Sequence, residues 1–477
     1  METVGKVKKN KLFKVGMVLA MGTLLTGCAS GTGASKSTSN SKGKVKNVIF
    51  MIGDGMGNSY TSGYRYYKAN GGERFVSQTE FDKYLIGQQA TYPEDPKQNV
   101  TDSASAATAM AAGVKTYNNA IGLDNDLSDT ESVLERAKKK GKSTGLVATS
   151  EITHATPAGY GAHEATRKSM DRIADDYFDE KIDGKHKIDV LLGGGSKLFE
   201  RDERNLVKEF EKDGYSHVTD KKSLEADNSD QILGLFATGG LPKMIDRTDE
   251  TPSLADMTDA AIKRLDKNKD GFFLMVEGSQ IDWAGHSNDI VGAMSEMEDF
   301  EAAFKKAIEF AEKDGETIVI ATADHSTGGL SIAADDVYNW DTKPIHQAKR
   351  TPDFMAEEIL EKGDVKKTLK DYIGFDLTDE EIASVEKTVK DAQELNKTNN
   401  EKAVDAVAIP IRKIFDVHSN TGWTTKGHTG EDVNVYAFGP QSDLFKGQIE
   451  NTDQAKLIFG LIEGTNKKED VKDVEKK

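Results

Sequence analysis

Cysteine is almost absent from this sequence, since Cys28 is the only one in 477 residues. A lone cysteine excludes an intramolecular disulfide and any metal centre built from several thiolates. An excess of basic charge is also lacking, because 80 acidic residues outnumber 63 basic ones and the formal net charge is −17. Proteins that bind nucleic acid need a basic face, so we expect no nucleic acid as a specific partner.

Long hydrophobic runs are missing as well. Beyond the N-terminal segment, no apolar run reaches the roughly 18 residues of a membrane-spanning helix. Hydrophobic residues still make up 37% of the chain, which is enough for a large buried core. The nine histidines and the many carboxylates leave open a metal site with nitrogen and oxygen ligands.

The N-terminus combines a lysine-rich head with the short apolar stretch Val15–Leu25, a pattern typical of a signal peptide. Leu25-Thr-Gly-Cys28 then resembles the bacterial lipobox, which implies cleavage before Cys28 and a lipid on its sulfur. We therefore predict a signal peptide at 1–27 and a lipidated Gly/Ser/Lys tether at 28–45. The protein would be exported and lipid-anchored at the extracytoplasmic face of the bacterial cell membrane. A plain secretory signal with a chance cysteine is the alternative.

From Lys46 onward, short apolar runs alternate with helical patterns. This alternation predicts an α/β fold with a mostly parallel sheet, and no 20–50-residue repeat is present. The expected strands lie at residues 47–52, 143–149, 272–276, 317–322 and 433–438, and the expected helices include 130–140, 254–265 and 296–313.

Several predicted strands are followed by a possible metal ligand. In open α/β sheets the functional crevice lies at the carboxyl ends of the strands, so these side chains should lie close together. Helix capping would explain any one of the acidic residues, but it explains the whole set less well. The candidates at strand ends are Asp54, Glu277, Asp324 and His325.

Three more candidate ligands come from other positions. Asp282 and His286 are four residues apart, which places both on one face of a helix. His428 lies in the glycine-flanked segment Gly427-His-Thr-Gly430. Carboxylate with imidazole suits zinc, whereas carboxylate with hydroxyl suits magnesium. The histidines without comparable neighbours, which we expect to be surface or core residues, are His163, His186, His217, His346 and His418.

One segment matches a calcium-binding loop. Residues 266–277 follow that pattern in full. However, Gly278-Ser-Gln280 follows directly where the second helix should begin, and Phe272–Val276 is entirely apolar. We therefore interpret this segment as a polar turn that opens a buried strand, with Glu277 belonging to the predicted ligand cluster.

The candidate nucleophile is Ser103, which lies near the start of the alanine-rich segment 101–113. Alanine favours a helix, and the free N–H groups at a helix N-terminus attract an anion. The alternative is that Asp102 or Ser103 only caps the helix. No Gly-x-Ser-x-Gly elbow is present, so a serine–histidine esterase is disfavoured. A serine here with metal ligands elsewhere fits phosphoryl transfer.

Taken together, these segments resemble the alkaline phosphatase family. The resemblance covers about residues 46–330 and 424–440, with six motifs in the family's order. The matching segments are Ile52-Gly-Asp-Gly-Met-Gly57, Thr101-Asp-Ser-Ala104, Ala155-Thr-Pro157 with Arg167, Met275-Val-Glu-Gly278 with Asp282 and His286, Thr322-Ala-Asp-His325, and Gly427-His-Thr-Gly430.

The resemblance implies a fold, a reaction and a set of ligands. It implies a three-layer sandwich with helices on both faces of the sheet, and hydrolysis of small phosphate monoesters through a phosphoserine on Ser103, with Arg167 gripping the phosphate. It also implies a homodimer. The implied ligand sets are Asp282, His286 and His428 for one zinc ion, Asp54, Asp324 and His325 for a second, and Asp54, Thr156 and Glu277 for one magnesium ion.

Two other functions remain open. A phosphodiesterase or sulfatase of the same superfamily would share the metal ligands, but its nucleophile is usually threonine or a modified residue. A non-catalytic lipoprotein that binds metal or phosphate would not need an aligned serine. Ser103 in its Thr-Asp-Ser-Ala context favours the monoesterase.

Two residues depart from the best-studied bacterial members of the family, where the position of His154 is an aspartate and that of Trp283 a lysine. An imidazole at the third metal site would make it less selective for magnesium and allow zinc or cobalt. The alternative is that His154 only hydrogen-bonds a water on the magnesium ion. Because residue 283 is tryptophan here and not lysine, the site has one positive charge fewer near the phosphate than those members have.

The segment at about 330–424 is a further departure from the family's pattern, because it is long and charged and separates two of the ligand motifs. Its pattern predicts helices, and we expect a helical insertion that forms a lid or an interface beside the site, or merely a solvated decoration. Residues 46–477 would then form one catalytic domain that carries this insertion.

Overall fold

The structure is a computed structural model, and it describes residues 43–71 and 76–469. The predicted signal peptide, Cys28 and most of the predicted tether lie outside these residues. Among the described helices, none combines the length and the apolar character needed to cross a membrane.

A ten-stranded sheet forms the centre of the fold, in the order β16-β2-β15-β10-β1-β9-β3-β6-β8-β7. The strands from β10 to β7 in this order run parallel to their neighbours, whereas β15 is antiparallel to both β10 and β2. The strands of the sheet are β1 (Asn47–Gly53), β2 (Leu85–Ala90), β3 (Ser143–Glu151), β6 (Val190–Gly194), β7 (Ser216–Val218), β8 (Ile232–Leu235), β9 (Phe272–Gly278), β10 (Thr317–Thr322), β15 (Val433–Phe438) and β16 (Gly447–Glu450).

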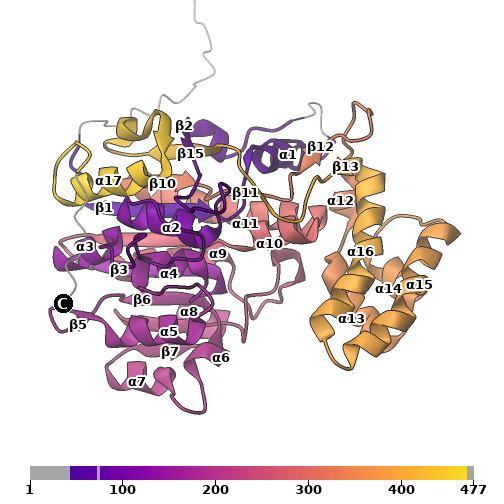
Figure 1. Cartoon of the computed structure of the whole chain (residues 1–477), viewed down its shortest axis with the longest axis horizontal. Coiled ribbons are helices and arrows are strands. Elements are labelled where there is room, and N and C mark those ends of the chain that lie inside the picture. The colour runs from indigo at the N-terminus through magenta and orange to yellow at the C-terminus, as the bar shows by residue number, and fades with distance from the viewer. Residues whose placement is uncertain (1–42, 72–75, 470–477) are drawn as a thin grey trace, which may run out of the picture. The chain divides into compact units, whose positions relative to one another are not determined.

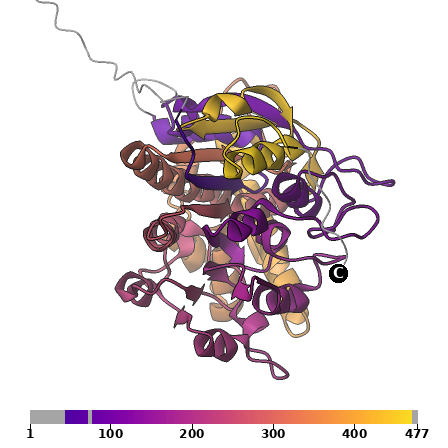
Figure 2. The ribbon, with the colours of Figure 1, turned by 90° about the vertical axis from the view of Figure 1, so that its left-hand side faces the viewer.

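Helices cover both faces of the sheet, as Figure 2 shows. Strand residues alternate between the two faces, so Ile49 packs into one hydrophobic cluster and Phe50 into the other. This packing confirms the predicted three-layer α/β sandwich with a mostly parallel sheet. The first cluster includes α1 (Asn58–Ala69), α9 (Leu254–Leu265) and α11 (Ile290–Asp314), and the second includes α2 (Ser103–Ala112), α3 (Val133–Lys139), α4 (Ala155–Gly161), α5 (Met170–Asp179) and α17 (Asn451–Ile462).

Shorter elements connect these layers. The segment that matched a calcium loop opens strand β9 instead, as the turn interpretation predicts. Three two-stranded pairs are β4 (Lys181–Ile182) with β5 (Lys185–His186), β11 (Ser326–Thr327) with β14 (His428–Thr429), and β12 (Ser331–Ile332) with β13 (Thr421–Gly422). The short helices are α6 (Ser196–Phe199), α7 (Leu206–Lys212), α8 (Lys221–Ala226), α10 (Gln280–Ser287), η1 (Phe81–Lys83), η2 (Met244–Asp246) and η3 (Ser442–Phe445).

Helices α12 to α16 occupy the long segment between β12 and β13 and lie beside the sheet in Figure 1. They share the hydrophobic cluster of α9 and α11, so they pack onto the main body. Polar contacts reinforce this packing, since Thr351 Oγ1 donates to Asp246 Oδ2 at 2.6 Å. Their bounds are α12 (Lys343–Gln347), α13 (Pro352–Lys362), α14 (Val365–Tyr372), α15 (Asp379–Asn396) and α16 (Asn400–Ser419).

The loop between α4 and α5, which carries Arg167, is anchored by a buried ionic network. Lys187 is only 1% exposed, and it forms ion pairs with Glu180 and Glu135. Nζ of Lys187 lies 3.5 Å from Oε1 of Glu135. His163 of this loop lies 3.4 Å from Glu180. Burial alone would lower the pKa of His163, but the hydrogen bond to Glu180 and the charge of Glu135 raise it to about 9. The expectation that His163 lacks comparable partners is therefore wrong.

We predict that Lys187→Met lowers the free energy of unfolding by about 3 kcal/mol, because it leaves the buried Glu135 and the partly exposed Glu180 without their lysine. Denaturant unfolding followed by circular dichroism measures this. Lys185→Met is the matched control: Lys185 is exposed, so its substitution should change stability by less than about 0.5 kcal/mol. Equal stability of the two variants would contradict the prediction.

Candidate active site

The strand-end candidates meet at the carboxyl edge of the sheet. Asp54 follows β1, whose neighbours β9 and β10 are parallel to it, and Ile52 is level with both Glu277 and Thr322. Asp54, Glu277 and Asp324 are each 0% exposed. The sheet therefore brings three carboxylates together in a buried setting.

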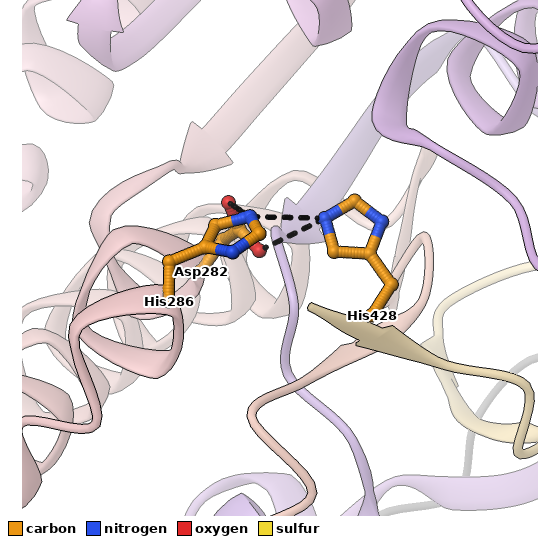
Figure 3. Close-up of side chains that lie close together, drawn as sticks. All are labelled: Asp282, His286 and His428. Atoms are coloured by element: carbon orange, nitrogen blue, oxygen red, sulfur yellow. Dashed lines mark hydrogen bonds and ion pairs between the residues drawn. The ribbon is translucent and has the colours of Figure 1, made fainter. Parts of the chain in front are cut away.

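A second group lies at α10, where Asp282 and His286 occupy successive turns as their spacing predicts. His428 joins them because β14 pairs with β11, which sets His428 opposite Thr327. Nε2 of His428 lies 3.1 Å from Nε2 of His286 and 3.6 Å from Oδ1 of Asp282, and Figure 3 shows the three side chains converging. These three residues have ligand atoms within 4.8 Å of one another.

Backbone carbonyls orient the two imidazoles of this group. Nδ1 of His428 donates to the carbonyl of Thr101 at 2.8 Å, and Nδ1 of His286 donates to that of Lys426. Each Nε2 then carries the lone pair and faces Asp282. Burial, with the nearby His325, lowers the pKa of His428 to about 4. The ring is therefore neutral near pH 7 and can bind a metal.

Asp54, Asp324 and His325 form the next group. Nε2 of His325 lies 3.1 Å from Oδ2 of Asp324 and 3.6 Å from Oδ1 of Asp54. Ser103 lies beside them, with its Oγ 3.1 Å from Nε2 of His325 and 3.5 Å from Oδ1 of Asp54. The candidate nucleophile thus faces this group of ligands.

A third group contains Asp54, Glu277 and His154, whose ligand atoms also lie within 4.8 Å of one another. Glu277 accepts a hydrogen bond from Ser279 Oγ at 2.7 Å through Oε2. Burial is the main cause that lowers the pKa of His154, and the positive charge of Arg167 is the second. The pKa falls to about 3, so the imidazole is neutral near pH 7. Thr156, on the first turn of α4, is fully buried.

The unpaired atoms of these groups are those that a bound cation would satisfy. Buried polar atoms normally have a hydrogen-bond partner, yet five buried ligand-type atoms here have none. Burial, together with the charges of Asp324, Asp282 and Glu277, holds the pKa of Asp54 well above its usual value. The donor set of carboxylate, imidazole and hydroxyl therefore fits zinc and magnesium. The five atoms are Asp54 Oδ2, His154 Nδ1, Thr156 Oγ1, Glu277 Oε1 and Asp324 Oδ2.

Ser103 is the first residue of α2, and Asp102 is the cap that precedes it. Oδ1 of Asp102 accepts from the Ser105 N–H at 3.0 Å, so the cap requires no bond from the Ser103 hydroxyl. Oδ2 of Asp102 accepts from Nη1 of Arg167 at 3.3 Å. Nη2 of Arg167 lies 3.0 Å from Nε2 of His154. One aspartate thus positions both the serine and the arginine.

Trp283 lies on α10 between His154 and the loop at Gly240. Its ring meets that of His154 edge-on, with centroids 5.8 Å apart. A Cβ atom at Gly240 would lie 2.5 Å from the indole, so the loop approaches the ring closely. The structure therefore places an uncharged aromatic side chain beside the third group.

Two contributors to the site were not predicted. Its position before an alanine-rich helix predicts Asp102 only as a cap, although it also binds Arg167. Thr327 donates through Oγ1 to Asp282, and no pattern in the sequence marks it. Adjacency to Ser103 was the only local signal for Asp102.

Comparisons with known proteins agree with this geometry. The family model for alkaline phosphatase matches residues 45–463. Alkaline phosphatase 3 of Bacillus subtilis is 60% identical over 448 residues, which cover 93% of this chain and 95% of that protein. The cold-active alkaline phosphatase of a psychrophilic Shewanella has a TM-score of 0.80 and 39% identity, over 87% of this chain and 99% of that one.

One further solved structure is similar to this chain. It is a histidine-to-aspartate mutant of alkaline phosphatase from the Antarctic bacterium TAB5, with magnesium bound in a site called M3. Its TM-score is 0.63 at 29% identity, covering 88% of this chain and 99% of that one. With the matches above, it confirms the resemblance that the sequence motifs indicated. This chain belongs to the alkaline phosphatase family, and it hydrolyses phosphate monoesters.

Proposed function

We propose that Ser103 is the nucleophile of this hydrolysis and forms a phosphoserine intermediate. The observation that carries the proposal is its position at the N-terminus of α2, where Oγ lies 3.1 Å from His325 and 3.5 Å from Asp54. Oγ attacks phosphorus, the bond from phosphorus to the alcohol oxygen breaks, and phosphoserine forms. Water then hydrolyses the phosphoserine, which releases inorganic phosphate and restores Ser103.

The three groups of ligands would hold the cations that this chemistry needs. One zinc ion would be held by Asp282, His286 and His428, a second by Asp54, Asp324 and His325, and magnesium by Asp54, Thr156 and Glu277. Cations held in the first two groups would supply positive charge beside the attacking oxygen of Ser103 and the leaving oxygen of the alcohol. The five unpartnered buried ligand atoms support this assignment.

Arg167 would bind the phosphate through its planar guanidinium, which can donate two parallel hydrogen bonds. Asp102 holds it in place by the 3.3 Å contact to Nη1. The free N–H groups at the start of α2 add donors for the same anion. Because these contacts recognise mainly the phosphate group, we expect low specificity for the alcohol part of the substrate.

We predict that Ser103→Ala lowers kcat for a phosphate monoester by about a thousandfold or more, because no group replaces Oγ in the attack. Mass spectrometry of acid-quenched wild-type enzyme should find phosphate on Ser103. The control is metal content, which should be unchanged in the variant because Ser103 is not among the proposed ligands. Undiminished turnover by metal-loaded Ser103→Ala protein would overturn the assignment.

We also propose that His154 binds the third metal directly through Nδ1, which makes this site less selective for magnesium. One observation supports this: Nδ1 is buried without a hydrogen-bond partner. Binding a metal through Nδ1 puts the ring proton on Nε2, so Nη2 of Arg167, which lies 3.0 Å from Nε2, would have to turn away, as it would to grip phosphate. The TAB5 histidine-to-aspartate mutant with magnesium in its M3 site is a parallel case. Imidazole favours zinc or cobalt over magnesium, which prefers oxygen.

We predict that His154→Asp tightens magnesium binding by about tenfold or more and weakens the response to cobalt, because an oxygen ligand replaces nitrogen. Calorimetric titration of demetallated protein, with zinc supplied first, measures the affinities directly. If wild type and variant bind magnesium and cobalt alike, His154 acts only through a hydrogen bond to bound water, and direct ligation is wrong.

Export and lipid anchoring are proposed from the N-terminal sequence alone, since Cys28 lies outside the described residues. We predict that Cys28→Ser moves the phosphatase activity out of the membrane fraction, because no other sulfur in the chain can carry the lipid. Fractionation of the expressing cells, with mass spectrometry of the mature N-terminus, measures this. Full retention of the variant on membranes would contradict it. A homodimer is also proposed, and it is supported only by the family resemblance.

A further inference from the structure

The amino edge of the main sheet lies opposite the candidate active site. Strands β1, β3, β9 and β10 all begin at this edge, which is at the left in Figure 1 and faces the viewer in Figure 2. The seven residues of β1, at about 3.3 Å per residue, separate Lys46 from Asp54 by roughly 25 Å. Whatever binds at this edge is therefore remote from Ser103.

An open cleft of about 540 Å³ lies at this edge, and lysines dominate its polar lining. Three carboxylates also line it: Asp270, Glu316 and Glu463. Val45, Leu461 and Ile462 supply an apolar floor. The five lysines, which we call the basic edge, are Lys44, Lys46, Lys140, Lys142 and Lys269.

Most of the basic edge is not neutralised. Lys140 pairs with Glu463 at 2.5 Å, but within the described residues no carboxylate lies within 4.0 Å of the other four side-chain nitrogens. Lys142 Nζ donates instead to the carbonyls of Lys46 and Asp270, at 2.8 and 2.7 Å. Burial, and then the charge of Lys44, lower the pKa of Lys142, while the charge of Asp270 raises it and that of Lys46 lowers it further.

Such a cluster is unexpected in a chain with a formal charge of −17. Crowded, unpaired lysines repel one another and destabilise the fold slightly, so a bound anionic surface would relieve the repulsion. A membrane rich in anionic lipid attracts lysines near its surface, each of which strengthens binding by about fivefold.

The chain itself indicates where a membrane would lie. Lys44 is sixteen residues after Cys28, and sixteen residues span at most about 55 Å even when fully extended. A lipid on Cys28 would therefore keep the body close to the bilayer, and the tether joins the body at the basic edge. The carboxyl edge, with the candidate active site, would then face the aqueous side.

We propose that the basic edge docks on anionic phospholipid headgroups and directs the active site away from the membrane. Docking by lysines does not require the lipid on Cys28, so the two proposals can fail independently. The phosphatase mechanism is also separate, because none of the five lysines touches a proposed metal ligand or Ser103.

The test uses the mature chain from residue 28 with Cys28→Ser, so that no lipid is attached. Its partition onto vesicles of neutral phosphatidylcholine is compared with that onto vesicles containing about one third phosphatidylglycerol. The variant combines Lys44→Gln, Lys46→Gln and Lys269→Gln, and leaves Lys142 in place because it donates to backbone carbonyls. The matched control combines Lys387→Gln, Lys390→Gln and Lys402→Gln. It removes the same charge from exposed lysines of α15 and α16 that form no ion pair with any other described residue.

We expect the unsubstituted chain to prefer anionic vesicles at least tenfold at low salt, and to lose this preference as salt rises. The basic-edge variant should bind anionic vesicles at least tenfold more weakly than the control variant, with kcat/KM for a soluble monoester equal in all three proteins. Equal partition of the two variants, or no preference for anionic vesicles in the unsubstituted chain, would overturn the proposal.

Discussion

Repulsion among buried carboxylates is the constraint on which the rest of the structure depends. Asp54, Glu277 and Asp324 are each fully buried at one edge of the sheet, and each keeps a carboxylate oxygen that accepts no hydrogen bond. Isolated buried charges cost several kcal/mol each. Protonation offsets part of that cost, as the raised pKa of Asp54 indicates, and bound cations would offset it as well, so the geometry that gathers the carboxylates also suits this edge to metal binding. The apolar strands β1, β9 and β10, packed on both faces, provide the stability that holds the carboxylates in place.

The residues that sequence reasoning placed well are those whose position follows from local rules. Asp54 and Glu277 come at the ends of apolar runs, and parallel neighbours end at one edge of a sheet. Asp282 and His286 share a helix face because of their spacing. The position of His428 could not be derived in this way, since it depends on the pairing of β14 with β11 about a hundred residues earlier. Only the family resemblance linked His428 to Asp282.

Long-range polar contacts account for what the sequence did not reveal. The charged residues near His163 in sequence do not mark its partners, because folding sets it against Glu135 and Glu180, which come from other segments. Asp102 satisfies its local role as a helix cap with one oxygen and reaches Arg167 with the other. Local propensity predicts the cap, because capping is a local interaction. It says nothing about the second oxygen, whose partner comes from a loop 65 residues later.

The two edges of the sheet differ in charge for a topological reason. In a parallel sheet the carboxyl ends of neighbouring strands collect side chains at one edge, and the turns that open the strands collect others at the opposite edge. Here the carboxyl edge gathers carboxylates and imidazoles, whereas the cleft at the amino edge is lined by five lysines, four of them without an ion pair in the described residues, and three carboxylates. Because β1 sets these edges roughly 25 Å apart, well beyond the ~8–10 Å screening length at physiological ionic strength, each keeps its own charge. On the docking proposal, that separation lets one edge meet anionic lipid while the other meets anionic substrate at a cation-bearing site.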